Sequence, residues 1–269
     1  MPDDPDETPP AAPPAAPPAA PRRRRSRGIY LLPNLFTTSA LFAGFYAVVE
    51  AHRGDFGTAG VAIFAAMILD GFDGRVARMT NTTTEFGAEY DSMADMVSFG
   101  LAPAYLMFAF SLSTLTEARY GQLGWVVAFV YVACCGLRLA RFNVAVGTAD
   151  KRFFQGLACP TAAVINAALV LVVIDLGYTG AEVVAVAAVS TFCTGLLMVS
   201  NFTYYSFKDL GTSRKLPFAM ALGVLLLLVT TAVDPPKMIL IAGTLYALSG
   251  PAWAVLRLVR RRNRIAARQ

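Results

Sequence analysis

Four aspartates interrupt an otherwise apolar part of the sequence, and their spacing could assemble a reactive site. Asp70 and Asp73 lie three residues apart, so in a helix they would share one face. Asp91 and Asp95 lie four residues apart and would share a face in the same way. An ionised side chain at the centre of a membrane helix costs about 2.5–3.5 kcal/mol, so such acids are functional candidates. We therefore expect these four residues to form the functional site.

Carboxylates that converge in this way repel one another unless cations bind between them. Oxygen ligands favour hard ions, so the cluster predicts Mg²⁺ or Mn²⁺. Two such ions are suited to displacement at phosphorus. Arg78, at the end of the first acidic helix, could donate two hydrogen bonds to a phosphate. The alternative is a structural ion-pair network, but Arg75 and Arg78 are too few to neutralise four acids.

The acids lie within a series of apolar segments that are long enough to cross a membrane. A helix needs about 20 residues to span a hydrocarbon core about 30 Å thick. The segments are continuously apolar rather than alternating, which favours helices over a barrel. They cover residues 30–51, 57–79, 88–112, 122–144, 160–178, 181–203, 215–233 and 236–258. The predicted fold is an all-α polytopic membrane bundle with about eight transmembrane helices.

The composition agrees with a membrane protein and excludes other classes. Hydrophobic residues make up 56% of the 269 residues and charged residues 15%, against about 25% charged residues in soluble domains. Four cysteines without paired spacing and one histidine argue against a disulfide framework or a zinc site. The net charge of +5 could suggest nucleic-acid binding. Because the basic residues flank membrane segments, we expect no nucleic-acid partner.

The distribution of Lys and Arg predicts the orientation of the chain. With eight spans and a cytoplasmic N-terminus, all of these residues except Arg53, Arg119 and Lys237 fall on the cytoplasmic side. This places both termini and the acids at the cytoplasmic face of the cytoplasmic membrane. The predicted organisation is a disordered Pro/Ala-rich tail with a basic anchor, a transmembrane catalytic domain and a basic cytoplasmic tail. These parts cover residues 1–28, 29–258 and 259–269.

The acidic segment resembles a known family signature. From Asp70 to Asp95 the chain reads D-x-x-D-G-x-x-A-R-x8-G-x-x-x-D-x-x-x-D, which is similar to the motif of the CDP-alcohol phosphotransferases. The resemblance implies that all four aspartates bind the metal ions and that Asp95 is also the general base. It implies a six-helix core, usually in a homodimer, so this chain would have two extra spans. The residues expected to bind the CDP-linked donor are Asn34, Thr37, Gly74, Arg78, Thr84 and Gly87.

Further segments resemble the bacterial branch of this family that uses serine as the acceptor. The similar segments are 32–39, 137–143, 154–160 and 200–208, although Ala158 stands where a proline is expected. The resemblance implies that CDP-diacylglycerol is the donor and L-serine the acceptor. Attack by the serine hydroxyl, assisted by metal, would then give phosphatidylserine and CMP.

The sequence leaves alternatives open for several residues and for the function. Arg138, Arg141 and Lys151 could bind a phosphate or carboxylate of the acceptor, or the two arginines could reach lipid headgroups. Asn34 and Thr37 could hydrogen-bond a base or bridge helices. The first alternative function is the same chemistry with glycerol 3-phosphate, inositol phosphate or choline. The second is a cation transporter, although transporters place such acids near the bilayer midplane.

Overall fold

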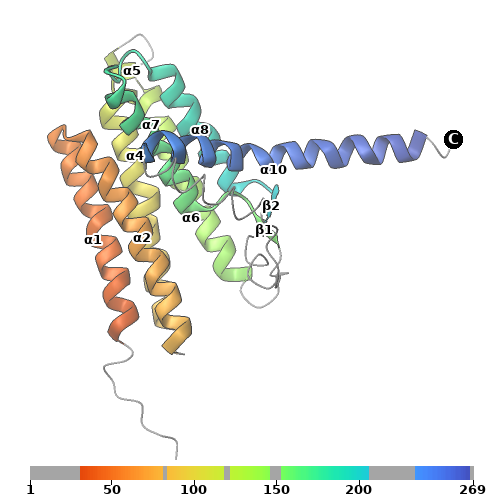
Figure 1. Cartoon of the computed structure of the whole chain (residues 1–269), viewed down its shortest axis with the longest axis horizontal. Coiled ribbons are helices and arrows are strands. Elements are labelled where there is room, and N and C mark those ends of the chain that lie inside the picture. Colours follow the sequence, from red (N-terminus) through yellow and green to blue (C-terminus); the bar gives the residue numbers. More distant parts are fainter. Residues whose placement is uncertain (1–30, 81–83, 118–121, 146–152, 206–233, 267–269) are drawn as a thin grey trace, which may run out of the picture.

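The computed structural model describes residues 31–80, 84–117, 122–145, 153–205 and 234–266, and most of these are helical. Figure 1 shows the helices and the short strand pair β1–β2. In chain order the elements are α1 (Leu31–Arg53), α2 (Phe56–Thr80), α3 (Glu85–Asp95), η2 (Met96–Leu101), α4 (Ala102–Met107), η3 (Phe108–Leu112), α5 (Thr114–Glu117), α6 (Leu123–Ala145), β1 (Phe153–Gln155), α7 (Cys159–Asp175), α8 (Val184–Val199), β2 (Thr203–Tyr205) and α10 (Pro235–Ala266), where η denotes a π-helical segment.

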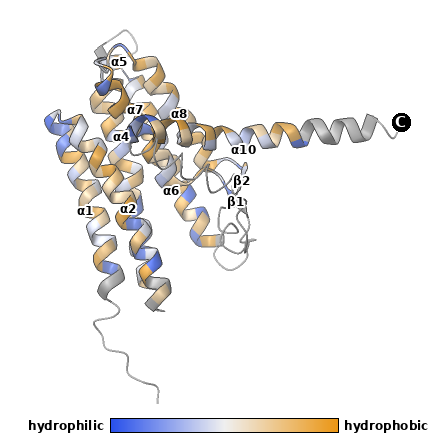
Figure 2. Cartoon of the chain, in the orientation of Figure 1, coloured by the Kyte–Doolittle hydropathy of each residue, from blue (hydrophilic) through white to orange (hydrophobic). Residues whose placement is uncertain are grey.

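The chain is an integral membrane protein built from helices. Among the described residues, four helical stretches are long and apolar enough to cross a membrane: Phe56–Val76, Glu85–Leu112, Leu123–Val144 and Pro235–Arg257. Many large apolar side chains lie exposed, where lipid would cover them. Hydrophobic residues occur along all of the long helices (Figure 2). The membrane-helical class is thus confirmed, whereas a count of eight spans is not.

Two of the expected spans are shorter than the sequence indicates, and one lies outside the described residues. The segments expected at 160–178 and 181–203 form α7, with 17 residues, and α8, with 16 residues. α8 ends because the backbone at Ser200 becomes extended, which directs the chain into β2. The segment expected at 215–233 lies outside the described residues.

α1 and α2 form an antiparallel hairpin that carries part of the site (Figure 1). Buried alanines on both helices let the two backbones approach closely. Gly54 closes the turn with a φ of 85°, a conformation that glycine adopts without strain. Asp55 then accepts hydrogen bonds from the backbone N–H and the hydroxyl of Thr58. These bonds lower the pKa of Asp55 and hold the start of α2.

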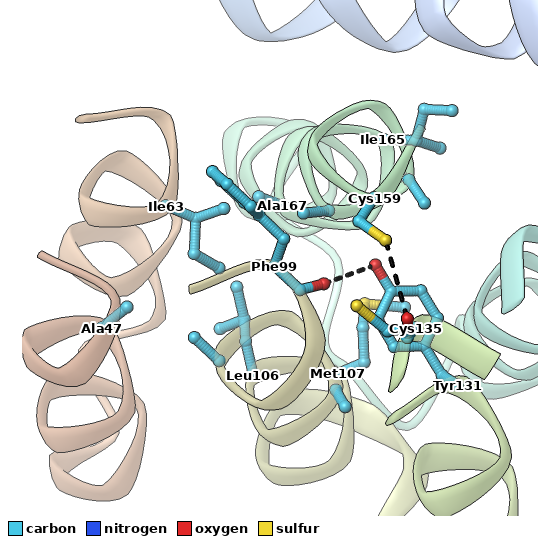
Figure 3. Close-up of a cluster of buried hydrophobic side chains, with 14 of the residues drawn as sticks. Ala47, Ile63, Phe99, Leu106, Met107, Tyr131, Cys135, Cys159, Ile165 and Ala167 are labelled. Atoms are coloured by element: carbon cyan, nitrogen blue, oxygen red, sulfur yellow. Dashed lines mark hydrogen bonds between the residues drawn. The ribbon is translucent and has the colours of Figure 1, made fainter. Parts of the chain in front are cut away.

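The third helical stretch, from Glu85 to Leu112, runs through the centre of the bundle. Phe99, Leu106 and Met107 are fully buried in it and lie in the core between α2, α6 and α7 (Figure 3). The stretch widens into π-helical turns at η2 and η3, and η2 begins directly after Asp95. Such turns shift the register of the residues that follow and recur at functional sites.

Two short strands adjoin the ends of α7 and α8. β1 precedes α7, and β2 follows α8. They pair antiparallel, with Phe154 opposite Tyr204. After β1, the N–H of Gly156 donates to the carbonyl of Phe202 over 2.9 Å, and that of Leu157 donates to Leu197 over 2.9 Å. Gly156 has a φ of 79°, and a Cβ there would overlap the carbonyl oxygen of Met198. This position therefore requires glycine for both backbone conformation and space.

α10 crosses the bundle and extends beyond it (Figure 1). It packs on α7, where Gly243 leaves room for Ile165, and on β2, where Gly250 leaves room for Tyr204. The Tyr204 hydroxyl donates to the carbonyl of Ala247 over 3.0 Å. α10 therefore covers part of α7 and of the β1–β2 pair.

We predict that Gly156→Ala lowers the melting temperature of the detergent-purified protein. A positive φ in a residue other than glycine costs about 1–3 kcal/mol, and the new Cβ must also displace the Met198 carbonyl. Gly177→Ala is the matched control because Gly177 has a φ of 76° but no atom within 4 Å of a Cβ. Equal melting temperatures for the two variants would show that the close contact has no effect.

Candidate metal centre and its surroundings

Three of the four aspartates, from α2 and α3, come together in the structure. Asp70 lies on α2, and Asp91 and Asp95 lie on α3. One carboxylate oxygen from each of these residues lies within 4.8 Å of the others. A short connection separates the end of α2 at Thr80 from the start of α3 at Glu85, so the two acidic ends must be neighbours. The structure therefore assembles three acids as their spacing predicts.

The fourth acid, Asp73, lies beside this group and is held by α1. Its side chain is buried, and the hydroxyl of Thr37 donates a hydrogen bond to its carboxylate over 2.8 Å. Asp73 still interacts electrostatically with Asp70 and Asp91. Three helices thus contribute to the acidic site, with Thr37 fixing the orientation of one carboxylate.

The arrangement fits a divalent cation. Asp91 has a buried carboxylate oxygen, Oδ1, that has no hydrogen-bond partner. Among the side chains that the structure describes, which do not include that of Arg78, no Lys or Arg forms an ion pair with any of the four aspartates. Carboxylates so close together in a partly buried place need positive charge, and hard oxygen ligands select ions such as Mg²⁺ and Mn²⁺. The acids themselves therefore form a group to which such an ion could bind.

The other residues expected to bind the donor lie on α1, on α2 and at the start of α3. Asn34 on α1 lies near Gly87, where its Oδ1 would be 3.6 Å from an added Cβ. The N–H of Gly87 donates to the hydroxyl of Thr84, which caps α3. A Cβ at Gly74 would meet nothing within 4 Å, so the surface of α2 is open there. Arg78 lies in the last turns of α2, and its side chain is outside the described part of the structure.

The two arginines of α6 have different surroundings. The Arg141 guanidinium donates to the carbonyls of Gln155, Val199 and Ser200 and to the side chain of Asn201, at 2.9 to 3.4 Å. The side chain of Arg138 instead donates to the sulfur of Cys159 over 3.4 Å. Lys151, the third basic residue expected near the acceptor, lies outside the described residues.

The structure adds partners that the sequence did not indicate. Cys159 interacts electrostatically with both Asp95 and Arg138. Ser92, next to Asp91, exchanges hydrogen bonds with Asn143 of α6. These residues are far apart in the sequence, and a cysteine or serine in an apolar segment carries no signal of such a role. The packing of η2, which directly follows Asp95, against α6 and α7 brings them near the acids.

Comparisons with known proteins assign this site to a family. The sequence model for CDP-alcohol phosphatidyltransferase matches residues 30–247, a range that contains all four aspartates. The chain belongs to this family. It is similar to the CDP-diacylglycerol–serine O-phosphatidyltransferase of Helicobacter pylori strain 26695, with 38% identity over 190 residues, covering 70% of this chain and 77% of that protein.

Other relatives, which match over shorter stretches, carry the same name. The protein from Mycobacterium leprae is 38% identical over 161 residues, covering 58% of this chain and 52% of that protein. The protein from Methanocaldococcus jannaschii is 32% identical over 147 residues, covering 55% of this chain and 63% of that protein. The family membership that the acidic motif predicts is therefore confirmed.

We predict that Thr37→Val weakens Mn²⁺ binding about 10- to 100-fold, the usual effect of removing a partner that orients a metal ligand. Valine keeps the shape of the side chain but removes the hydrogen bond to Asp73. Electron paramagnetic resonance titration of purified protein with Mn²⁺ would measure the change.

Thr38→Val is the matched control for this variant. The Thr38 hydroxyl donates to the carbonyl of Asn34 and lies 2.9 Å from the Tyr90 hydroxyl, so it does not contact an acid. Equal Mn²⁺ affinities in Thr37→Val and Thr38→Val would contradict an orienting role for Thr37.

Proposed function

We propose that this protein transfers the phosphatidyl group of CDP-diacylglycerol to L-serine and releases CMP. The observation that carries the proposal is the acidic site of α2 and α3, in a chain that belongs to the CDP-alcohol phosphatidyltransferase family. Relatives from bacteria and an archaeon are named for serine as the acceptor. The protein is thus a CDP-diacylglycerol–serine O-phosphatidyltransferase, and its product is phosphatidylserine.

The site residues have distinct roles in this proposal. Asp70, Asp73, Asp91 and Asp95 hold two divalent ions, Mg²⁺ or Mn²⁺. When bound, these ions neutralise charge on the phosphates and assist the displacement at phosphorus. The residues that contact the CDP-linked donor are Asn34, Thr37, Gly74, Arg78, Thr84 and Gly87.

Asp95 acts as the general base for the acceptor. The serine hydroxyl is a poor nucleophile at neutral pH, and Asp95 takes its proton as the oxygen attacks the phosphorus that carries diacylglycerol. A new oxygen–phosphorus bond forms while the bond from that phosphorus to CMP breaks, and the electron pair leaves with CMP. Arg78 neutralises charge that develops on the leaving phosphate. A covalent enzyme intermediate is unnecessary because the acids are engaged as ligands.

The placement in the membrane follows from charge and hydropathy. α1, α7, α8 and residues 215–233 complete eight spans in this proposal, and the Lys and Arg distribution puts both termini and the site on the cytoplasmic side. The acyl chains of the donor remain in lipid beside the exposed apolar residues of α1 and α2. We also propose the three-part organisation at residues 1–28, 29–258 and 259–269, and a homodimer as the functional form.

We predict that purified protein with Mn²⁺ or Mg²⁺ releases CMP from CDP-diacylglycerol when L-serine is present. Parallel reactions contain glycerol 3-phosphate, inositol phosphate or choline, and mass spectrometry identifies each lipid product. Phosphatidylserine should form in the serine reaction alone. CMP release with a different acceptor would keep the phosphoryl chemistry and overturn the assignment of serine. Cation flux into liposomes without CDP-lipid would instead support a transporter.

We predict that Asp95→Asn lowers kcat by about 10²- to 10⁴-fold, the usual contribution of a general base, with a much smaller effect on binding of the donor lipid. Asp91→Asn should abolish turnover, because it removes a metal ligand, in a protein that still inserts into the membrane. Initial rates and CDP-diacylglycerol binding, measured on both purified variants, test the two roles. Equal losses of rate and donor affinity in Asp95→Asn would make Asp95 mainly a binding residue.

A further inference from the structure

A buried tyrosine of α6 contacts the π-helical turn that follows Asp95. Tyr131 is fully buried, and its hydroxyl donates a hydrogen bond over 3.1 Å to the main-chain carbonyl of Phe99 in η2 (Figure 3). In the apolar core of a membrane bundle, phenylalanine would fill nearly the same space without a polar group that must be paired. The hydroxyl of Tyr131 therefore serves the backbone of η2 rather than the packing of the core.

The Phe99 carbonyl needs this donor because of the proline four residues later. In an α-helix, the N–H of residue 103 would donate to the carbonyl of residue 99. Pro103, the second residue of α4, has no N–H to donate. η2 is also wound more widely than an α-helix, since the N–H of Ala102 donates to Val97, five residues earlier. Membrane helices tolerate a proline where a neighbouring helix pairs the freed backbone group, and the Tyr131 hydroxyl does so here.

α7 and α8 hold Tyr131 in place. α8 packs against its backbone at Gly195, where an added Cβ would be 3.1 Å from the Tyr131 Cα. On α7, the fully buried Asn166 interacts with the Tyr131 side chain. Asn166 is itself fixed, since it donates to the Thr194 hydroxyl over 3.1 Å and accepts from the Ser190 hydroxyl over 2.8 Å. Polar groups that are paired inside a membrane bundle in this way make the arrangement of the helices rigid.

The contact lies close enough to Asp95 to control the position of its carboxylate. Asp95 directly precedes η2, and Phe99 follows it by four residues, about one helical turn. This turn is held toward α1, where the Ser98 hydroxyl donates to the carbonyl of Ala40 over 3.0 Å. The Tyr131 hydroxyl holds the next residue of the same turn toward α6. Without that bond the turn is anchored on one side only, and the carboxylate can shift relative to the other acids.

We propose that Tyr131 is a positioning residue for Asp95. This inference rests on the proposed function, in which Asp95 is the general base, and extends it to the residue that fixes that carboxylate in place. Tyr131 acts through the Phe99 carbonyl and does not touch the substrate, and Asn166 supports it from behind. A displacement of about 1 Å at a catalytic group can cost about 100-fold in rate, so this hydrogen bond has a measurable effect on catalysis.

The experiment compares Tyr131→Phe with Tyr204→Phe in full-length protein purified in detergent with saturating Mn²⁺. Both tyrosines are buried, and each hydroxyl donates to a main-chain carbonyl, that of Phe99 or that of Ala247. We expect Tyr131→Phe to lower kcat about 10- to 100-fold, the usual effect of removing a group that orients a ligand. Its KM for CDP-diacylglycerol should not change, because the proposed donor-binding residues all precede Asp95. Tyr204→Phe should lower the melting temperature by a similar amount and keep kcat.

Mn²⁺ affinity provides a second readout that needs no acceptor. Since Asp95 is one of the proposed ligands, electron paramagnetic resonance titration should show weaker Mn²⁺ binding in Tyr131→Phe than in Tyr204→Phe. If Tyr131→Phe lowers only the melting temperature and keeps both kcat and Mn²⁺ affinity, the hydroxyl serves the stability of the bundle alone. That result would overturn the proposal.

A double-mutant cycle identifies the carbonyl through which Tyr131 acts. Pro103→Ala restores the N–H that an α-helix would direct at Phe99, so this carbonyl gains a donor other than the tyrosine. In the Pro103→Ala background, Tyr131→Phe should therefore lower kcat by a much smaller factor than in the unmodified protein. An equal loss in the two backgrounds would show that Tyr131 acts by another route, which also overturns the proposal. If Pro103→Ala alone stops turnover, the cycle is measured on Mn²⁺ affinity.

Failure of the proposed function would give a different result. If the unmodified protein releases CMP with another acceptor and not with serine, the assignment of serine fails, and the two tyrosine variants are compared with that acceptor. If Asp95→Asn keeps its kcat, Asp95 is not the base and the proposed mechanism fails. If Asp95→Asn loses kcat while Tyr131→Phe keeps it, only the positioning role is overturned.

Discussion

The repulsion between carboxylates in a membrane protein is the constraint on which the rest of this structure depends. Three oxygens from Asp70, Asp91 and Asp95 lie within 4.8 Å of one another, in a chain whose exposed surface is largely apolar. Such a group is tolerated only if cations bind it and if the carboxylates are held in fixed positions. On one side of the site, α2 is held in position by its alanine contacts with α1 and by the hydrogen bond from Thr37 to Asp73.

On the other side of the site, the third helical stretch holds Asp95 in position. Ser98 in η2 donates to the carbonyl of Ala40, and Gly44 lets the two backbones meet because any Cβ there would overlap Ser98. Ser98 is only three residues after Asp95. The position of that carboxylate along α1 is therefore fixed by backbone packing rather than by a flexible side chain. A π-helical turn accommodates the close approach without ending the helix. Small residues and a π-helical turn thus fix the position of Asp95.

The sequence predicted the acidic site better than it predicted the helices around it. Spacing alone places Asp91 and Asp95 on one helical face, and an acid inside an apolar segment is a strong signal because it is costly. The end of α8 at Val199 and the β1–β2 pair were missed, because Phe202, Tyr204 and their neighbours are apolar in either conformation. The choice between strand and helix there depends on hydrogen bonds to residues about 50 positions earlier, which a local pattern does not contain.

Arg138 and Arg141 show why residue type and spacing do not determine a role. Both are arginines near the same end of α6, and three residues of separation predict a shared face. Arg141 meets main-chain carbonyls at the end of α8 and at the end of β1. The end of a helix leaves such acceptors unpaired. Arg138 instead lies at the beginning of α7, where it donates to the Cys159 sulfur. The neighbouring backbone therefore decides which arginine is held by main-chain carbonyls and which one is not.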